Sequence, residues 1–149
     1  MDNTRKDLLT DKMKDYLVGI SKIEEQKPVA RIGEIATVLG VKGSSAHVMV
    51  KTLAKRNMVR YEKYGYVTLT EEGEEIADEL INKNNIIKNF LIRYLGIDEK
   101  TAIDDANKIK NILSKETFAK LKKFIYFLEN RPDHMDINYP QEVEAFSKT

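Results

Sequence analysis

Residues 31–70 run RIGEIATVLG, VKGSSAHVMV, KTLAKRNMVR and YEKYGYVTLT, which is two short helical patterns followed by a hairpin pattern. The first pattern spaces its apolar residues along one helix face and ends at Gly40, a residue suited to a left-handed helix end. Gly43, Ser44 and Ser45 are predicted to open the second helix, with the serine hydroxyls capping its first amide groups. The buried stripe of that helix is predicted to comprise Val48, Met49, Leu53 and Ala54.

A two-stranded hairpin is predicted after the second helix. Apolar and aromatic residues at 58–61 and 67–69 flank a turn that contains Gly65. A helix, a turn, a second helix and a hairpin in this order form a winged helix-turn-helix, whose second helix enters the major groove of DNA. We therefore predict a mainly α fold that begins with a winged helix-turn-helix DNA-binding domain.

Charge is distributed unevenly along the chain. Residues 42–63 hold six Lys or Arg and one acid, and residues 1–70 carry a net charge of +5 against −4 for residues 71–149. The total of +1 conceals this basic half, and basic surfaces gain affinity for DNA by releasing its counterions. A lysine-rich solvated surface would explain the charge alone, but its coincidence with the helix-turn-helix order favours DNA binding.

The residues predicted to contact double-stranded DNA lie on the second helix and on the segments that flank it. Ser44, Ser45 and His47 are expected to approach base edges or the backbone at the start of this helix. Lys42, Lys51, Thr52 and Lys55 are expected to contact phosphates, and Lys63 and Tyr64 are expected to flank the wing. The predicted set comprises Arg31, Lys42, Ser44, Ser45, His47, Lys51, Thr52, Lys55, Lys63 and Tyr64.

Composition excludes several classes of function. The 149 residues include no cysteine, which rules out disulfides, thiolate nucleophiles and cysteine metal ligands. No window approaches the roughly 20 apolar residues of a membrane span, and the N-terminal residues lack the apolar core of a signal peptide, so no membrane partner and a cytoplasmic location are predicted. The sequence contains no glycine-rich phosphate loop, His-Glu-x-x-His motif or serine elbow, and we predict that the protein is not an enzyme.

Amphipathic helical patterns fill most of the remaining chain. One is predicted at about 10–25, a long linker helix at about 73–95, and two more at 98–113 and after Ser114. The predicted domains are 1–72, which binds DNA, and 73–130, which is helical. The tail at 131–149 has two prolines and little periodicity, so an extended or partly disordered end is predicted. The apolar faces exceed the need of one small domain, which favours a homodimer interface over an ordinary intramolecular core.

Several motifs together resemble the diphtheria-toxin-repressor family, and especially its short manganese-transport-regulator branch. They are RIGEIA at 31–36, LGV at 39–41, SSAHVMVKTL at 44–53, YEKY at 61–64, LTxxG at 69–73 and NFL at 89–91. The resemblance covers about residues 8–128. It implies a dimeric transcriptional regulator, a metal-activated repressor in the family, with a helical dimerisation domain.

The resemblance also implies a metal site, and most of its ligands are replaced in this chain. The matching positions are Asp15, Val18, Asn84, Lys88, Asn107, Lys110 and Asn111. Only Asp15 keeps the carboxylate, and two positions hold lysine, whose ammonium repels a cation. We therefore predict no metal at these positions and a regulator that is independent of metal.

A positive side chain at these positions has two explanations. Lys110, together with Lys88, could place a permanent charge near Asp15 and take the role of the metal in joining the first helix to the second domain. Drift of surface residues after the loss of metal sensing is the alternative.

Two other functions stay open at this point. The winged helix could bind a partner protein instead of DNA, although the basic segment argues against this. The chain could also sense manganese, iron, zinc or a small molecule through other ligands, such as Asp15, Asp104, Asp105 or His134.

Overall fold

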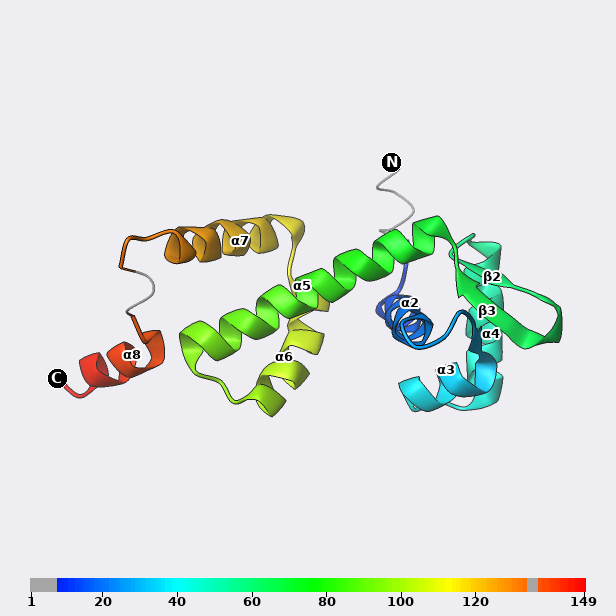
Figure 1. Cartoon of the computed structure of the whole chain (residues 1–149), viewed down its shortest axis with the longest axis horizontal. Coiled ribbons are helices and arrows are strands. Elements are labelled where there is room, and N and C mark those ends of the chain that lie inside the picture. The colour runs from blue at the N-terminus through cyan, green and yellow to red at the C-terminus, as the bar shows by residue number, and fades with distance from the viewer. Residues whose placement is uncertain (1–7, 134–136) are drawn as a thin grey trace. The chain divides into compact units, whose positions relative to one another are not determined.

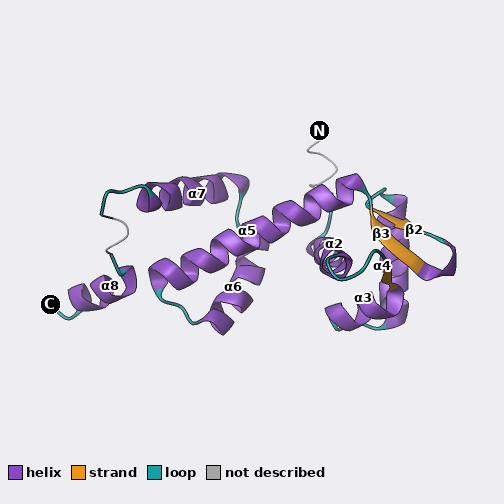
Figure 2. Ribbon diagram, in the orientation of Figure 1, coloured by secondary structure: helices purple, strands orange, loops and turns teal. Residues whose placement is uncertain are grey.

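The computed structural model describes residues 8–133 and 137–149, which form two compact units that meet within one long helix, at Ile81 and Asn82 (Figure 1). Helices dominate both units, and the described strands all belong to one small sheet in the first unit (Figure 2). This confirms the predicted mainly α class with a winged helix-turn-helix at the start. Each unit is described by itself below.

The first unit contains the predicted helix, helix-turn-helix and wing. Its elements are α2 (Asp11–Glu24), β1 (Ala30–Arg31), α3 (Ile32–Leu39), α4 (Gly43–Lys55), β2 (Val59–Tyr61), the 3-10 turn η1 (Lys63–Gly65), β3 (Tyr66–Leu69) and the first turns of α5 (Glu71–Leu95). The helix-turn-helix bends where predicted, because Gly40 ends α3 in the left-handed conformation, with φ of 64°.

The sheet has one strand more than the predicted hairpin. The strand order is β1-β3-β2 and both pairings are antiparallel, with Ala30 opposite Val67 and Val59 opposite Leu69. Strand β1 is only two residues long, too short to show the alternation of polar and apolar residues from which strands are predicted. It pairs with β3 and so fixes the start of α3 beside the wing.

The core of the first unit joins all of its helices to the sheet. Leu17 and Ile20 of α2, Ile35 of α3 and Leu53 of α4 are each fully buried, at 0% exposure. Full burial of a side chain of this size contributes about 1.5–3 kcal/mol. Residues 76, 77 and 80 of α5 belong to the same buried cluster, so the first turns of α5 are packed in the first unit.

The wing is joined to α5 by a buried threonine. The Thr70 hydroxyl donates to the carbonyl of Asn57 at 2.7 Å and accepts from the N–H of Gly73 at 3.1 Å, while the Thr70 N–H donates to the Met58 carbonyl at 3.0 Å. A Cβ atom at Gly73 would lie 2.0 Å from that same carbonyl oxygen. The LTxxG motif therefore has a physical origin, since it lets the first turn of α5 close against the backbone before β2.

The second unit contains the rest of α5, α6 (Glu99–Ile112), α7 (Lys115–Glu129) and α8 (Tyr139–Ser147). Helix α6 is capped by Asp98, and α7 by Ser114 as predicted. The buried residues of this unit include Ile87 of α5, Ala102 and Ala106 of α6 and Leu128 of α7.

Helix α8 replaces the extended end predicted for the tail, so that prediction is wrong for residues 139–147. Asn138 caps α8 by accepting from the Gln141 N–H, and Pro140 lies in its first turn, where a missing N–H costs nothing. The ring of Tyr139 packs edge-on against Tyr94, and Pro140 lies beside Gly96 at the end of α5. Periodicity missed this helix because it has no buried apolar stripe; its apolar residues Val143 and Phe146 are exposed.

The predicted domain division after residue 72 stays a prediction. The compact units divide nine residues later, inside α5. Within residues 8–133 and 137–149, none of the helices combines the length and the apolar character needed to cross a membrane.

We expect Gly73→Ala to destabilise the first unit, because the added methyl meets a backbone carbonyl that is held in the wing and cannot rotate away. Overpacking of this kind costs about 1–3 kcal/mol, which chemical denaturation of the full chain would measure. Gly33→Ala is the matched control, since a Cβ atom there would have no heavy atom within 4 Å in the described structure. This substitution only reduces the conformational entropy that the unfolded chain loses on folding. Equal unfolding free energies for the two variants would contradict this account.

Candidate nucleic-acid interface

One face of α4 is fully buried and the opposite face is solvent-exposed. Ala46, Val50 and Leu53 have 0% exposure, whereas Val48 is 65% exposed. The predicted buried stripe is therefore wrong at Val48. The remaining members, Met49, Leu53 and Ala54, do pack in or against the core. The helix is rotated relative to the prediction, since Ala46 and Val50 belong to the buried cluster in place of Val48.

Helix α4 begins at Gly43 as predicted, but the serine hydroxyls do not cap it as predicted. Lys42, in an extended conformation, is the N-cap residue, and no side-chain hydrogen bond caps this helix. Ser44 and Ser45 lie inside the first turn and are exposed. Their hydroxyl groups are not used as caps and are presented, together with the positive end of the helix dipole, to the solvent.

Most of the residues predicted to bind DNA are exposed, and they lie on α4, on the wing and at the start of α3. The exposed members are Arg31, Lys42, Ser44, Ser45, Lys51, Lys55, Lys63 and Tyr64, and His47 and Thr52 are partly buried. No salt bridge within the described residues involves the lysines of α4. Their charge is available to an external anion.

His47 connects α4 to the wing. Its Nδ1 atom and the Tyr61 hydroxyl of β2 are 3.1 Å apart, and the two rings meet edge to face with centroids separated by 5.7 Å. This hydrogen bond occupies one of the two ring nitrogens, and which partner donates depends on the tautomer. The residue is therefore a structural link between the helix and the hairpin as well as a candidate DNA contact.

Arg31 is held on the other edge of the sheet. Its Nη2 atom donates to the Tyr66 hydroxyl at 3.2 Å, and its guanidinium carbon lies 5.0 Å from the centre of the Tyr66 ring. The backbone N–H of Arg31 donates to the Glu34 carboxylate at 3.0 Å. These contacts fix the arginine beside β3 and leave it exposed, as a phosphate-binding residue requires.

The tip of the wing carries an exposed aromatic ring in an unfavourable backbone conformation. Tyr64 has φ of 73° and is 89% exposed, and Gly65 follows it with φ of 78°. A left-handed conformation costs a residue with a side chain about 1 kcal/mol or more. The tip is thus shaped by a tight turn that points Tyr64 away from its own fold.

The replaced metal positions in the second unit include a buried lysine. Lys110 of α6 is 7% exposed, and its Nζ atom donates to Asn107 Oδ1 at 3.5 Å. The side-chain oxygens of Asn84 and Asn111 are buried, and no donor among the described residues reaches them. Lys83 Nζ donates to the Leu113 carbonyl at 3.3 Å and holds this part of α5 against the end of α6.

These residues do not fit a divalent transition metal. Such a metal requires imidazole or carboxylate donors, and the buried groups at these positions are the amide oxygens of Asn84 and Asn111 and the ammonium of Lys110. In residues 8–133 and 137–149, there is no group of three or more His, Asp or Glu side chains that could hold a metal. Asp15 belongs to the first unit, so its predicted link to Lys110 and Lys88 stays a prediction, and His134 lies outside the described residues.

Two family models match nearly the whole chain. Residues 8–67 match the iron-dependent repressor N-terminal DNA-binding domain, and residues 70–139 match the iron-dependent repressor metal-binding and dimerisation domain. The chain belongs to the iron-dependent repressor family. This confirms the predicted resemblance to the diphtheria-toxin-repressor family, which includes the manganese-transport regulators. The family consists of DNA-binding transcriptional regulators, not enzymes, which confirms that prediction also.

Relatives of known sequence and structure agree with this membership. An uncharacterized HTH-type transcriptional regulator of Methanocaldococcus jannaschii is 38% identical over 78% of this chain and 94% of its own length. The regulator MntR of Bacillus pumilus is 34% identical over 82% of this chain and 84% of its own length. The structure of the manganese regulator SloR matches with a TM-score of 0.67 and 25% identity, covering 77% of this chain. The chain spans only about half of that protein, 54% of its length.

Proposed function

We propose that this family member is a homodimeric, sequence-specific DNA-binding repressor of transcription that does not require a metal at the family positions. The observation that carries the proposal is the outer face of α4, which presents serines and lysines around the exposed Val48, on the side away from its buried residues. A rigid core holds this helix, so its outer face is presented in one orientation.

The charges around α4 support contact with a DNA duplex. Lys51 and Lys55 lie on its outer face, and Lys42 precedes its first turn. Lys63 at the wing and Arg31 beside β3 extend the positive surface to both sides of the helix. Lysine and arginine contacts to phosphates position a protein on DNA, and the helix between them discriminates the bases.

Lys51→Ala and Lys55→Ala should each weaken duplex binding on all sequences. Each lost phosphate contact lowers the slope of log K against log salt by about 0.9, which fluorescence anisotropy at several salt concentrations would measure. Lys123→Ala is the control, because this exposed lysine lies on α7 in the second unit. If neither α4 variant changes the salt slope, DNA does not bind at α4. If the chain binds no duplex even at low salt, a protein partner is favoured instead of DNA.

The second unit supports independence from metal. A divalent ion at the family positions would have to displace or lie against the buried ammonium of Lys110. Like charges in a poorly solvated site repel strongly. Lys110 instead supplies a positive charge that is present without any effector, beside amide oxygens that a metal would coordinate only weakly.

We expect DNA affinity to be the same with a chelator as with added manganese, ferrous iron or zinc, and calorimetry to detect no manganese binding at these positions. The double variant Asn84→His with Lys110→Glu adds two metal donors and should bind manganese. Lys108→Glu is its control, because it adds a carboxylate at an exposed position of the same helix. An increase in the DNA affinity of the unaltered chain on adding metal would overturn the proposal and favour other ligands, such as Asp104 or Asp105.

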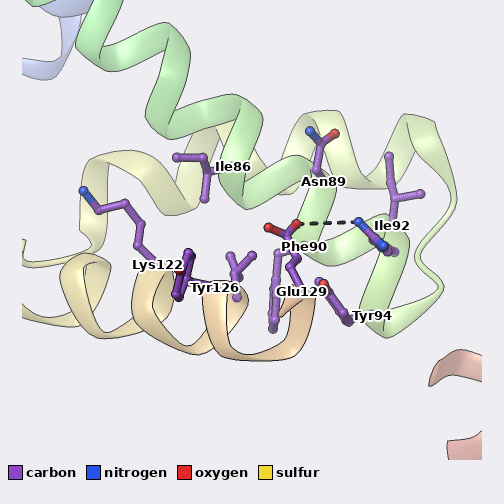
Figure 3. A pocket seen from close by; sticks show the side chains of 10 residues that line it. Ile86, Asn89, Phe90, Ile92, Tyr94, Lys122, Tyr126 and Glu129 are labelled. Atoms are coloured by element: carbon purple, nitrogen blue, oxygen red, sulfur yellow. Dashed lines mark ion pairs between the residues drawn. The ribbon is translucent and has the colours of Figure 1, made fainter. Parts of the chain in front are cut away.

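Exposed apolar surface on α7 and α8 supports a dimer. Phe124 and Phe127 of α7 are 51% and 59% exposed, and Phe146 of α8 is 83% exposed. An open hollow of about 550 Å³ lies between α5 and α7, lined by Ile86, Phe90 and Tyr126 among others and bounded by an ion pair between Arg93 and Glu129, whose atoms are 3.5 Å apart (Figure 3). We infer that a second copy covers this surface, in keeping with the dimerisation domain that residues 70–139 match.

Phe127→Glu should convert the dimer into a monomer, because it would place a charge in an apolar interface. Light scattering coupled to size-exclusion chromatography measures the molar mass directly. Lys123→Glu is the matched control, since it makes a larger change of charge on the same helix at a position that is already polar. A monomeric mass for the unaltered chain at micromolar concentration would refute the dimer without affecting the assignment of α4.

A further inference from the structure

The outer face of α4 is polar at its edges and apolar at its centre. Successive residues of an α-helix are rotated by about 100°, so Val48 points almost directly away from the buried Ala46, Val50 and Leu53. Its neighbours on this face lie about one turn away, at Ser44 and at Thr52. A 65% exposed valine here contributes nothing to the core of its own unit.

Two polar groups beside Val48 are already used inside the protein. The Thr52 hydroxyl donates to the Val48 carbonyl at 3.0 Å, which turns this donor back onto the helix. On the other side, the Nδ1 atom of His47 is paired with the Tyr61 hydroxyl. The centre of the face is therefore a methyl surface, with Ser44, Ser45 and the lysines around it.

The major groove offers one group that an aliphatic side chain can recognise. Guanine, adenine and cytosine present hydrogen-bond donors and acceptors there, whereas thymine adds a methyl group at C5. A valine opposite any other base edge would cover polar atoms without pairing them, which is unfavourable. Contact between methyl groups is favourable because it removes apolar surface from water.

We propose that Val48 recognises the C5-methyl group of a pyrimidine, the methyl of thymine, in each half of the DNA site. This inference rests on the proposed DNA-binding function and names the base that α4 selects. Cytosine methylated at C5 presents the same methyl group, so the two bases must be separated by experiment.

The test uses the full chain and a duplex selected by the unaltered protein from a random library. Each thymine of the selected site is replaced in turn by uracil, which differs only in lacking the methyl group. At one position in each half-site, this replacement should weaken binding by about fourfold, the factor that corresponds to one buried methyl group. For Val48→Ala the same replacement should change affinity by less than about twofold, because the contact is already lost.

Two controls keep the result specific. Val38→Ala removes the same atoms from a valine of α3 that is 52% exposed, and it should keep the full uracil penalty. Thermal unfolding of both variants checks that they fold like the unaltered chain, as their exposure predicts. At the sensitive position, 5-methylcytosine paired with guanine should bind more tightly than unmethylated cytosine if the methyl group alone is recognised, and thymine should remain the tightest.

The possible outcomes separate the inference from the proposed function. If the unaltered chain selects a site but uracil costs the same for Val48→Ala as for the unaltered chain, the role of Val48 is refuted and DNA binding stands. If no thymine is sensitive to loss of its methyl group, the role of Val48 is likewise refuted. If the chain selects no sequence at all, the proposed function fails and the inference fails with it.

Discussion

The burial of one face of α4 is the constraint on which the proposed function depends. Ala46, Val50 and Leu53 pack against the fully buried residues of α2 and α3, and this contact decides which side chains of α4 face the solvent. The alanine matters because a larger residue there would hold α4 away from the other helices. The serines, the lysines and Val48 of α4 are therefore exposed because of the helix geometry, and not because each is polar.

The order of elements could be predicted from the sequence, whereas the rotation of α4 could not. Periodic apolar residues and the left-handed Gly40 define the helix-turn-helix, and the hairpin follows from alternating residues around a glycine turn. The sequence pattern predicts a buried Val48 because both sides of α4 carry aliphatic residues, so the pattern fits two rotations of the helix. Only the packing of Ala46 distinguishes them, and it depends on residues of other helices.

Short elements escaped prediction for a related reason. Strand β1 has too few residues to show a period, and α8 has no buried apolar stripe. Both contact distant parts of their own units, β1 pairing with β3 and α8 packing against the end of α5. In the second unit, the sequence alone indicated that the metal ligands are replaced, since the amino-acid types suffice for that. It could not indicate that Lys110 is buried or that the oxygens of Asn84 and Asn111 have no donor in the described structure. Those facts require coordinates.

The backbone conformation of Tyr64 at the wing tip makes the folded state less stable than it could be. At the other positions of the described chain where φ is positive, the residue tolerates this conformation: glycine at 40, 65 and 96 and asparagine at 57. At position 64 it supplies tyrosine, although the ring is almost fully exposed and the conformation costs about 1 kcal/mol or more. Glycine or asparagine would make a more stable isolated protein. The tip of the wing thus departs from the optimum for stability, a departure typical of residues kept for contacts outside the fold.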